Sequence, residues 1–150
     1  MHAGHEIPAQ VRPANDSGYL EQMTRAVFQA GFSWQVIRDK WPDFVRAFHG
    51  FDVEAVAGYD EGDVERLLGD AGIVRNGRKI VATMENARTI QRLAQSHGSF
   101  YNYLRSLDGL PYAERRARLS KQFRNLGPTG VFTFLWSVDE PVPEWEERNR

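Results

Sequence analysis

Apolar side chains in this chain recur at three- and four-residue spacing within short runs, and glycine, proline, aspartate or serine separates one run from the next. That spacing places apolar residues on one face of an α-helix, whereas a half-buried strand needs alternation with a period of two. No segment alternates in that way, and no internal repeat is visible. The sequence therefore predicts an all-α protein, a bundle of about seven or eight short helices.

Local start and stop signals give the expected bounds of these helices. They cover residues 19–30, 33–48, 53–57, 60–71, 76–95, 99–107, 112–125 and 129–138. Ser33, Asp52 and Asp60 are expected N-caps, because their side-chain oxygens can accept the free N–H groups of a first helical turn. Gly31 is expected to end the first helix. Pro42 predicts that the second helix is kinked into two short pieces.

The length and the termini predict a single small domain. A chain of 150 residues suits one core. We expect a flexible arm over residues 1–16, a helical domain over 17–138 and an acidic tail over 139–150. The N-terminus has no apolar run typical of a signal peptide, and no stretch approaches the ~18 apolar residues of a membrane span. We therefore expect a cytoplasmic monomer with no membrane partner.

The cysteine and histidine content restricts the chemistry. The chain has no cysteine, which excludes disulfides, thiolate metal sites and a cysteine nucleophile. The four histidines, His2, His5, His49 and His97, lack the spacing of metal ligands. We therefore expect no metal and no cofactor.

Charge is distributed unevenly along the chain. Residues 66–124 hold twelve Lys/Arg against four Asp/Glu, whereas residues 17–65 hold four against nine and residues 139–150 hold two against five. A basic middle between acidic flanks is typical of a surface that binds a polyanion, although solvated helix faces give the same pattern.

The segment from Asp63 to Ile80, DVERLLGDAGIVRNGRKI, predicts a helix, a tight turn and a second helix. Gly72 would take a positive φ in the turn, and Ile73 would fill the gap between the helices. Backbone N–H groups of the turn and of the second helix would then form a phosphate site. The residues expected to contact DNA are Gly72, Ile73, Val74, Arg75, Asn76, Arg78 and Lys79, with Lys121 from the basic helix. The alternative is an ordinary helical hairpin with surface arginines.

Three blocks of the sequence resemble the 3-methyladenine DNA glycosylase I family of helix-hairpin-helix proteins. They are Gln29-Ala30-Gly31-Phe32-Ser33-Trp34, the hairpin segment just described, and Leu119-Ser120-Lys121 with the following Gly127 and the helix containing Thr133. The resemblance covers roughly residues 23–137. It implies a DNA repair enzyme that binds duplex DNA, flips out an alkylated purine of the 3-methyladenine type and hydrolyses its N-glycosidic bond.

The resemblance also implies a base pocket. Trp34 matches a tryptophan that stacks on the base, and Phe32, Tyr19 and Gln29 are expected to join it. Alternatively, Trp34 belongs to the core, as we expect of Trp41, Phe44 and Phe48.

The chain departs from the family in several respects, including the absence of a clear counterpart of the family's N-terminal segment with its pocket tyrosines. Ala26 stands where the family reads the base with a glutamate, and the cysteine ligands of the family's structural zinc are absent. No residue is identified as the catalytic group. The chain could therefore be a DNA-binding protein that has lost catalysis, and a helical protein–protein module is a third reading.

Overall fold

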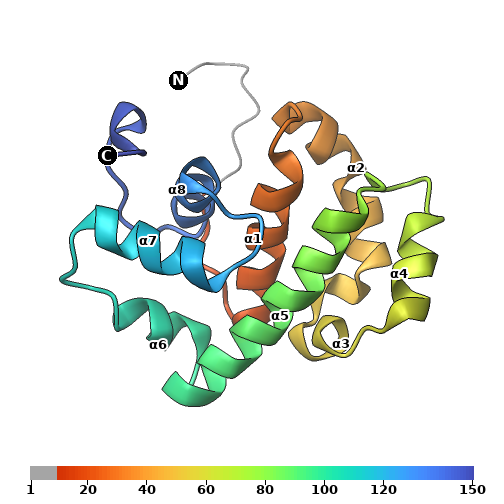
Figure 1. The fold of residues 1–150 in the computed structure, drawn as a ribbon, viewed down its shortest axis with the longest axis horizontal. Coiled ribbons are helices and arrows are strands. Elements are labelled where there is room, and N and C mark those ends of the chain that lie inside the picture. Colours follow the sequence, from red (N-terminus) through yellow and green to blue (C-terminus); the bar gives the residue numbers. More distant parts are fainter. Residues whose placement is uncertain (1–9) are drawn as a thin grey trace.

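The computed structural model of the protein describes residues 10–150, and all the regular secondary structure in this part of the chain is helical, with no strand. The expected all-α class is thus confirmed (Figure 1). The α-helices are α1 (Asp16–Gln29), α2 (Trp34–Ala47), α3 (Val53–Ala57), α4 (Glu61–Leu68), α5 (Gly77–His97), α6 (Phe100–Arg105), α7 (Tyr112–Gln122) and α8 (Pro128–Ser137). The 3-10 helices are η1 (His49–Phe51) and η2 (Trp145–Glu147). No expected helix end differs from the observed one by more than three residues.

The expected N-caps are formed. Ser33 and Asp52 each accept the backbone N–H three residues further on, at 3.3 and 2.9 Å. Asp60 and Asp63 make a reciprocal capping box at the start of α4, with both bonds at 3.1 Å. Gly31, with φ +86°, ends the first helix in the left-handed conformation that glycine adopts without strain.

Pro42 does not split the second helix, so the expectation of two pieces is wrong. α2 runs without interruption from Trp34 to Ala47, with Pro42 inside it. Pro42 is exposed, and water can therefore replace the hydrogen bond that its missing N–H removes.

The long helix α5 crosses the middle of the molecule (Figure 1) and packs against α1, α3 and, near its C-terminal end, α6. α1 also packs against α2 and α8, and α8 packs against α7. The helices α2, α3 and α4 thus lie around the first half of α5, whereas α6 and α7 lie beyond its second half. The hairpin precedes the N-terminal end of α5, whereas α7 ends beside the second half of α5, where Arg92 donates to Gln122 at 3.1 Å.

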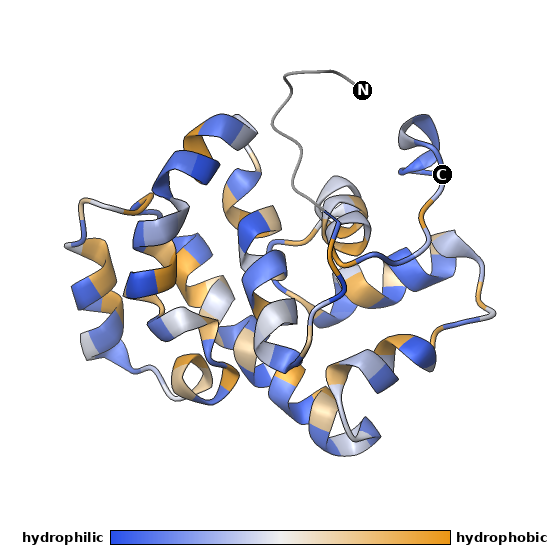
Figure 2. Ribbon diagram, turned by 180° about the vertical axis from the view of Figure 1, so that it is seen from behind, coloured by the Kyte–Doolittle hydropathy of each residue, from blue (hydrophilic) through white to orange (hydrophobic). Residues whose placement is uncertain are grey.

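The core near α2 is a row of aromatic rings. Trp41 stacks on Phe44 and Phe51 with centroids 5.0 and 5.3 Å apart, and Phe48 lies 5.4 Å from Phe51. The expectation that Trp41, Phe44 and Phe48 are core residues is confirmed, since all three are buried. Most helices carry both hydrophilic and hydrophobic segments (Figure 2), as amphipathic helices around a core do.

The residues just before α1 contact the last α-helix. The Val11 N–H donates to the Ser137 carbonyl at 3.0 Å. The Arg12 guanidinium lies 3.8 Å from the carboxylate of Glu140. The first nine residues of the expected arm lie outside the described part of the chain, so its flexibility stays a prediction.

The acidic segment 139–150 lies against the helical body. Its Glu140 is 5% exposed and is ion-paired with Arg105 of α6. Arg116 of α7 donates to two carbonyls near the C-terminus at 2.7 and 3.0 Å. α7 thereby holds the end of the chain. Within residues 10–150, no helix combines the length and the apolar character needed to span a membrane.

Candidate functional site

Residues 69–76 form the expected hairpin between α4 and α5. Ile73 is 2% exposed, as expected of a residue that fills the gap between two helices. Asn76 caps α5 by accepting the Lys79 N–H at 3.1 Å. The helix, turn and helix predicted from the sequence are therefore present.

Gly72 is required for a different reason from the one expected. Its φ is not in the left-handed region, so the predicted positive φ is wrong. Instead, a Cβ at this position would lie 2.8–2.9 Å from side-chain atoms of Asp43 on α2. The Gly72 N–H donates to the carboxylate of Asp70 at 2.8 Å and, together with Arg46, holds the pKa of Asp70 below its usual value. This N–H is therefore not available to a phosphate.

Other donors of the hairpin remain available. The backbone N–H groups of Val74, Arg75, Gly77 and Arg78 have no acceptor among residues 10–150. The side chains of Arg75 and Arg78 are exposed beside them. A helix start with free N–H groups and two adjacent guanidinium groups can hold an anionic oxygen. The hairpin can therefore hold a phosphate, through the residues after Gly72.

Lys79 is directed away from this surface. Its ammonium donates to the Ala30 carbonyl at 2.6 Å and lies 5.4 Å from the centroid of the Phe32 ring. Partial burial lowers the pKa of Lys79. Lys79 thus stabilises the end of α1, and its predicted contact with DNA stays a prediction.

Trp34 begins α2 and is partly buried, with Arg25 of α1 over its ring. The Arg25 guanidinium carbon lies 5.0 Å from the Trp34 centroid and 4.7 Å from the Trp41 centroid. Both distances are within the range of a cation–π contact. The two tryptophans are seven residues apart on one face of α2, so the crossing of α1 and α2 brings Arg25 to both.

Several further contacts hold Arg25 in place. Its guanidinium lies 3.6 Å from the carboxylate of Glu21 and donates to Gln22 at 3.3 Å. Glu21 also accepts the indole N–H of Trp41 at 2.9 Å. The Arg25 side chain is only 18% exposed, and burial lowers its pKa, although an arginine remains charged at any ordinary pH. The face of Trp34 toward α1 is therefore occupied by a cation of the chain itself.

The other three residues expected in the base pocket do not all lie beside Trp34. Phe32 is 42% exposed in the turn before Trp34. Gln29 has a buried side-chain oxygen with no hydrogen-bond partner within the described residues. Tyr19 is 1% exposed and packs on Phe100 of α6, with centroids 5.2 Å apart. The structure therefore keeps Phe32, Gln29 and Trp34 around one turn and places Tyr19 in the core.

The basic helix α7 divides its cations between two tasks. Arg115 donates to the Pro141 carbonyl at 3.2 Å, and Arg116 binds the C-terminal segment as described above. Arg118 and Lys121 are exposed instead, and Arg118 contacts Glu114 at 3.4 Å. Of the four cations, only Arg118 and Lys121 are directed to a surface where a polyanion could meet them.

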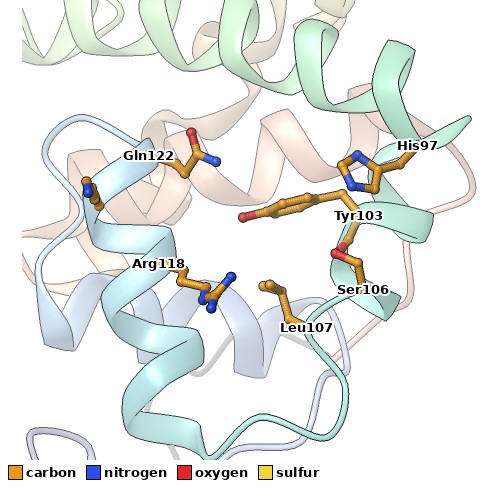
Figure 3. A pocket seen from close by; sticks show the side chains of 7 residues that line it. His97, Tyr103, Ser106, Leu107, Arg118 and Gln122 are labelled. Carbon is orange, nitrogen blue, oxygen red and sulfur yellow. The ribbon is translucent and has the colours of Figure 1, made fainter.

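Arg118 and Lys121 line a hollow of about 700 Å³ between α6 and α7 (Figure 3). The other lining residues are His97, Tyr103, Ser106, Leu107 and Gln122. Figure 3 shows the side chains of Arg118, Gln122 and Tyr103 directed toward this space. The hollow lies at the far end of α5 from the hairpin, so the predicted DNA contact of Lys121 would be separate from the phosphate site.

Two carboxylates that could otherwise activate water, on α1 and α5, are already bound to other side chains. Glu21 binds Arg25 and Trp41, and Glu85 lies 3.1 Å from Arg124. Ala26 contributes no carboxylate and is 4% exposed. Among residues 10–150 no three His, Cys, Asp or Glu side chains are placed to hold a metal ion, while His2 and His5 lie outside the described residues.

A family model described as methyladenine glycosylase matches residues 9–125. The chain belongs to this family. It is 41% identical over 93 residues to DNA-3-methyladenine glycosylase 1 of Escherichia coli K12, a match that covers 61% of this chain and 50% of that protein. It is 27% identical over 94 residues to the DNA-3-methyladenine glycosylase of Haemophilus influenzae Rd, covering 62% and 51%. The chain thus spans about half the length of the curated relatives it matches.

Solved structures of methyladenine glycosylases share the fold. A structure of 3-methyladenine DNA glycosylase I from Staphylococcus aureus, concerned with 3-methyladenine recognition, has a TM-score of 0.77 at 25% identity, covering 89% of this chain and 81% of that one. A second 3-methyladenine DNA glycosylase I has a TM-score of 0.74 at 28% identity, covering 85% and 81%. The helix-hairpin-helix bundle expected from the sequence is therefore the fold of this chain.

Sequence reasoning missed Arg25. The sequence does contain a signal for it, because Arg25 is the one charged residue between Met23 and Phe28. In the structure every other residue of that segment is buried. A charged residue inside an apolar helix run needs a specific partner. In this member of the methyladenine glycosylase family the partners are Glu21 and two tryptophan rings.

Proposed function

We propose that this protein is a DNA glycosylase that binds duplex DNA, turns a damaged purine out of the helix and hydrolyses its N-glycosidic bond during base excision repair. The observation that carries the proposal is the match of residues 9–125 to the methyladenine glycosylase family. The hairpin supports it, because its free N–H groups lie beside the exposed side chains of Arg75 and Arg78. 3-Methyladenine, which the relatives' names contain, is the first substrate to test.

Binding and base recognition would use different elements. The hairpin would hold a backbone phosphate, which fixes the position of the protein on the duplex without reading sequence. The turn from Gln29 to Trp34 would receive the extruded base, since it presents an exposed phenylalanine and a partly buried tryptophan. Stacking on these rings would offset the cost of leaving the DNA stack.

The reaction needs water to add to the anomeric carbon while the purine leaves with the bonding electrons. An alkylated purine that carries a positive charge is already a good leaving group. Positioning of the base and the water can therefore supply a large part of the rate, without a strong general base. The loss of a carboxylate at Ala26 weakens the grip on the base edge but leaves this route open.

The second candidate function is that of a DNA-binding protein that has lost catalysis. Ala26 and the occupied face of Trp34 favour it. A protein–protein module without DNA binding is a third reading, and a strong salt dependence of duplex binding would argue against it. The monomeric state and the cytoplasmic location also stay predictions.

The test compares the wild type with Arg75→Gln/Arg78→Gln on methylated duplex DNA. We expect release of methylated purine by the wild type above the uncatalysed rate, with release and duplex affinity reduced together in the double variant. Duplex binding without release would favour the non-catalytic protein. Failure to bind duplex DNA at low salt would contradict both DNA-binding candidates.

A further inference from the structure

One lysine of α5 connects the start of that helix to the turn between α1 and α2. The Lys79 ammonium donates to the Ala30 carbonyl at 2.6 Å and to the Phe28 carbonyl at 3.4 Å. It also lies 5.4 Å from the ring centroid of Phe32, within the range of a cation–π contact. Three groups of the turn thus contact one side chain, which lies 49 positions after Ala30 in the sequence.

The C-terminal end of α1 is a favourable place for this cation. The last carbonyls of a helix have no partner within it, and they form the negative end of the helix dipole. α1 has no basic residue in its last turn, so the positive charge comes from another helix. No carboxylate among the described residues is close enough to raise the pKa of Lys79, which partial burial lowers. The ammonium is therefore stabilised by the carbonyls and the ring of this turn.

The backbone of Lys79 belongs to the helix start that forms the candidate phosphate site. Its N–H donates to the side chain of Asn76, which caps α5. Between these two residues, Gly77 and Arg78 contribute N–H groups that have no acceptor within residues 10–150. Lys79 therefore joins a helix start that can hold a phosphate to the turn that presents the expected base-stacking rings.

Few other hydrogen bonds hold this turn. The Phe32 N–H donates to the Gln29 carbonyl at 2.8 Å, and Gly31 between them has a φ of +86° and no side chain. In the described part of the chain, Lys79 is the only side chain from outside α1 and α2 that hydrogen-bonds to residues 28–33. The position of the turn relative to α5 thus depends on this one ammonium group.

We propose that Lys79 is a positioning residue, which holds the Gln29–Trp34 turn at a fixed place relative to the phosphate bound by the hairpin. This inference rests on the proposed function and adds the group that couples its two sites. The bound phosphate sets the place where the base leaves the duplex, and a displacement of the receiving turn by about 1 Å would lower the reaction rate strongly. The alternative is the direct DNA contact predicted from the sequence, in which Lys79 itself binds a phosphate.

The test compares the wild type with Lys79→Met, Lys79→Arg and Lys40→Met. Methionine keeps an unbranched apolar side chain but removes the ammonium, whereas arginine keeps a cation that can donate to both carbonyls. Lys40→Met removes one lysine charge from α2, at a residue without a hydrogen bond, ion pair or ring contact within the described residues. The melting temperature of each variant separates loss of folding from loss of positioning.

Three properties of each folded protein are measured. They are the dissociation constants for methylated and unmethylated duplex DNA, the single-turnover rate of purine release at saturating protein, and the amide hydrogen exchange of residues 28–34 and 69–76. The exchange measurement follows the turn and the hairpin directly, without any dependence on catalysis.

We expect Lys79→Met to bind the unmethylated duplex about as tightly as the wild type, because the donors of the hairpin are unchanged. Its preference for the methylated duplex should fall about threefold to tenfold, and its release rate about tenfold to hundredfold. Hydrogen exchange should become faster in residues 28–34 and stay unchanged in residues 69–76. Lys79→Arg should regain most of the preference and of the rate, and Lys40→Met should keep both at the wild-type values.

The inference is overturned if folded Lys79→Met keeps the wild-type preference and release rate, or if the exchange of residues 28–34 does not change. Equal losses of affinity for both duplexes would also overturn it, and would make Lys79 a phosphate contact. If the wild type prefers the methylated duplex without releasing a base, the preference and the exchange decide. If the wild type neither prefers nor cleaves the methylated duplex, the proposed function fails, and the inference fails with it.

Discussion

The side chain of Asp43 on α2 occupies the space in which a Cβ of residue 72 would lie, with its atoms 2.8–2.9 Å from that position. The hairpin therefore packs this closely against α2 because residue 72 has no side chain. Gly72→Ala should lower the free energy of unfolding by about 1–3 kcal/mol, the usual cost of overpacking. Chemical denaturation measures this loss.

The matched variant is Gly72→Ala combined with Asp43→Gly. Because Asp43→Gly removes the close atoms, the loss in the double variant should be smaller than the sum of the two single losses. Strict additivity would mean that Asp43 is not what excludes a side chain at residue 72.

Tyr19→Phe should leave the protein as stable as the wild type or up to about 1 kcal/mol more stable at neutral pH, because an unpaired buried hydroxyl is costly. The Tyr19 hydroxyl is buried without a hydrogen-bond partner within residues 10–150. Excision of a damaged base should not change, since Tyr19 lies in the core. A large loss of activity in the folded variant would return Tyr19 to the base pocket.

Tyr19 also predicts a loss of stability at high pH. Burial, with the nearby charge of Glu140, raises the pKa of Tyr19 to about 12 from its ordinary value of 10. Between these values the unfolded chain releases the proton and the folded one keeps it, so the free energy of unfolding falls as the pH rises from 10 to 12. The slope of that fall, measured by denaturation, should be smaller in Tyr19→Phe than in the wild type.

The helices and their caps follow from local patterns, whereas the Trp34 site depends on how two helices cross. Ser33, Asp52 and Asp60 cap the helices that the sequence predicts because a cap involves only residues three positions apart. The contact of Arg25 with Trp34 and Trp41 depends on the crossing of α1 and α2, which no local spacing specifies. Sequence reasoning could therefore place Trp34 at a helix start but not reveal the cation over its ring.

Gly72 shows a similar limit. A glycine between two helices suggests a left-handed turn, and at Gly31 that interpretation is correct. At Gly72 the glycine is needed because Asp43, 29 positions earlier in the sequence, approaches the backbone. A turn with a positive φ and the close approach of another side chain both favour glycine, and only the tertiary structure shows which of the two reasons applies.

Arg118→Gln/Lys121→Gln tests whether the hollow between α6 and α7 meets DNA. If each side chain neutralises one phosphate, the slope of log affinity against log salt should become smaller by about 0.9 per contact. Arg115 and Arg116 are unsuitable for this test, because they hold the C-terminal segment. An unchanged slope would show that this face of α7 points away from the duplex.

Chelator treatment should leave the melting temperature of the purified protein unchanged. The chain has no cysteine, and residues 10–150 contain no cluster of side chains that could hold a metal ion. A stoichiometric metal in the purified protein, or a lower melting temperature after chelation, would contradict this prediction.

Trp34→Ala should weaken binding to a damaged duplex about tenfold to hundredfold, because a base stacked on an aromatic side chain contributes about 1–3 kcal/mol. Trp34→Phe should retain part of the affinity, since it keeps a smaller ring at the start of α2. Trp34→Ala also removes the ring that Arg25 contacts, and Trp34→Phe replaces it with a smaller one, so the melting temperature must be measured beside the affinity. The comparison that isolates stacking is the ratio of damaged to undamaged duplex affinity, which a loss of stability alone does not change. Equal ratios in the wild type and both variants would place the base-binding surface away from Trp34.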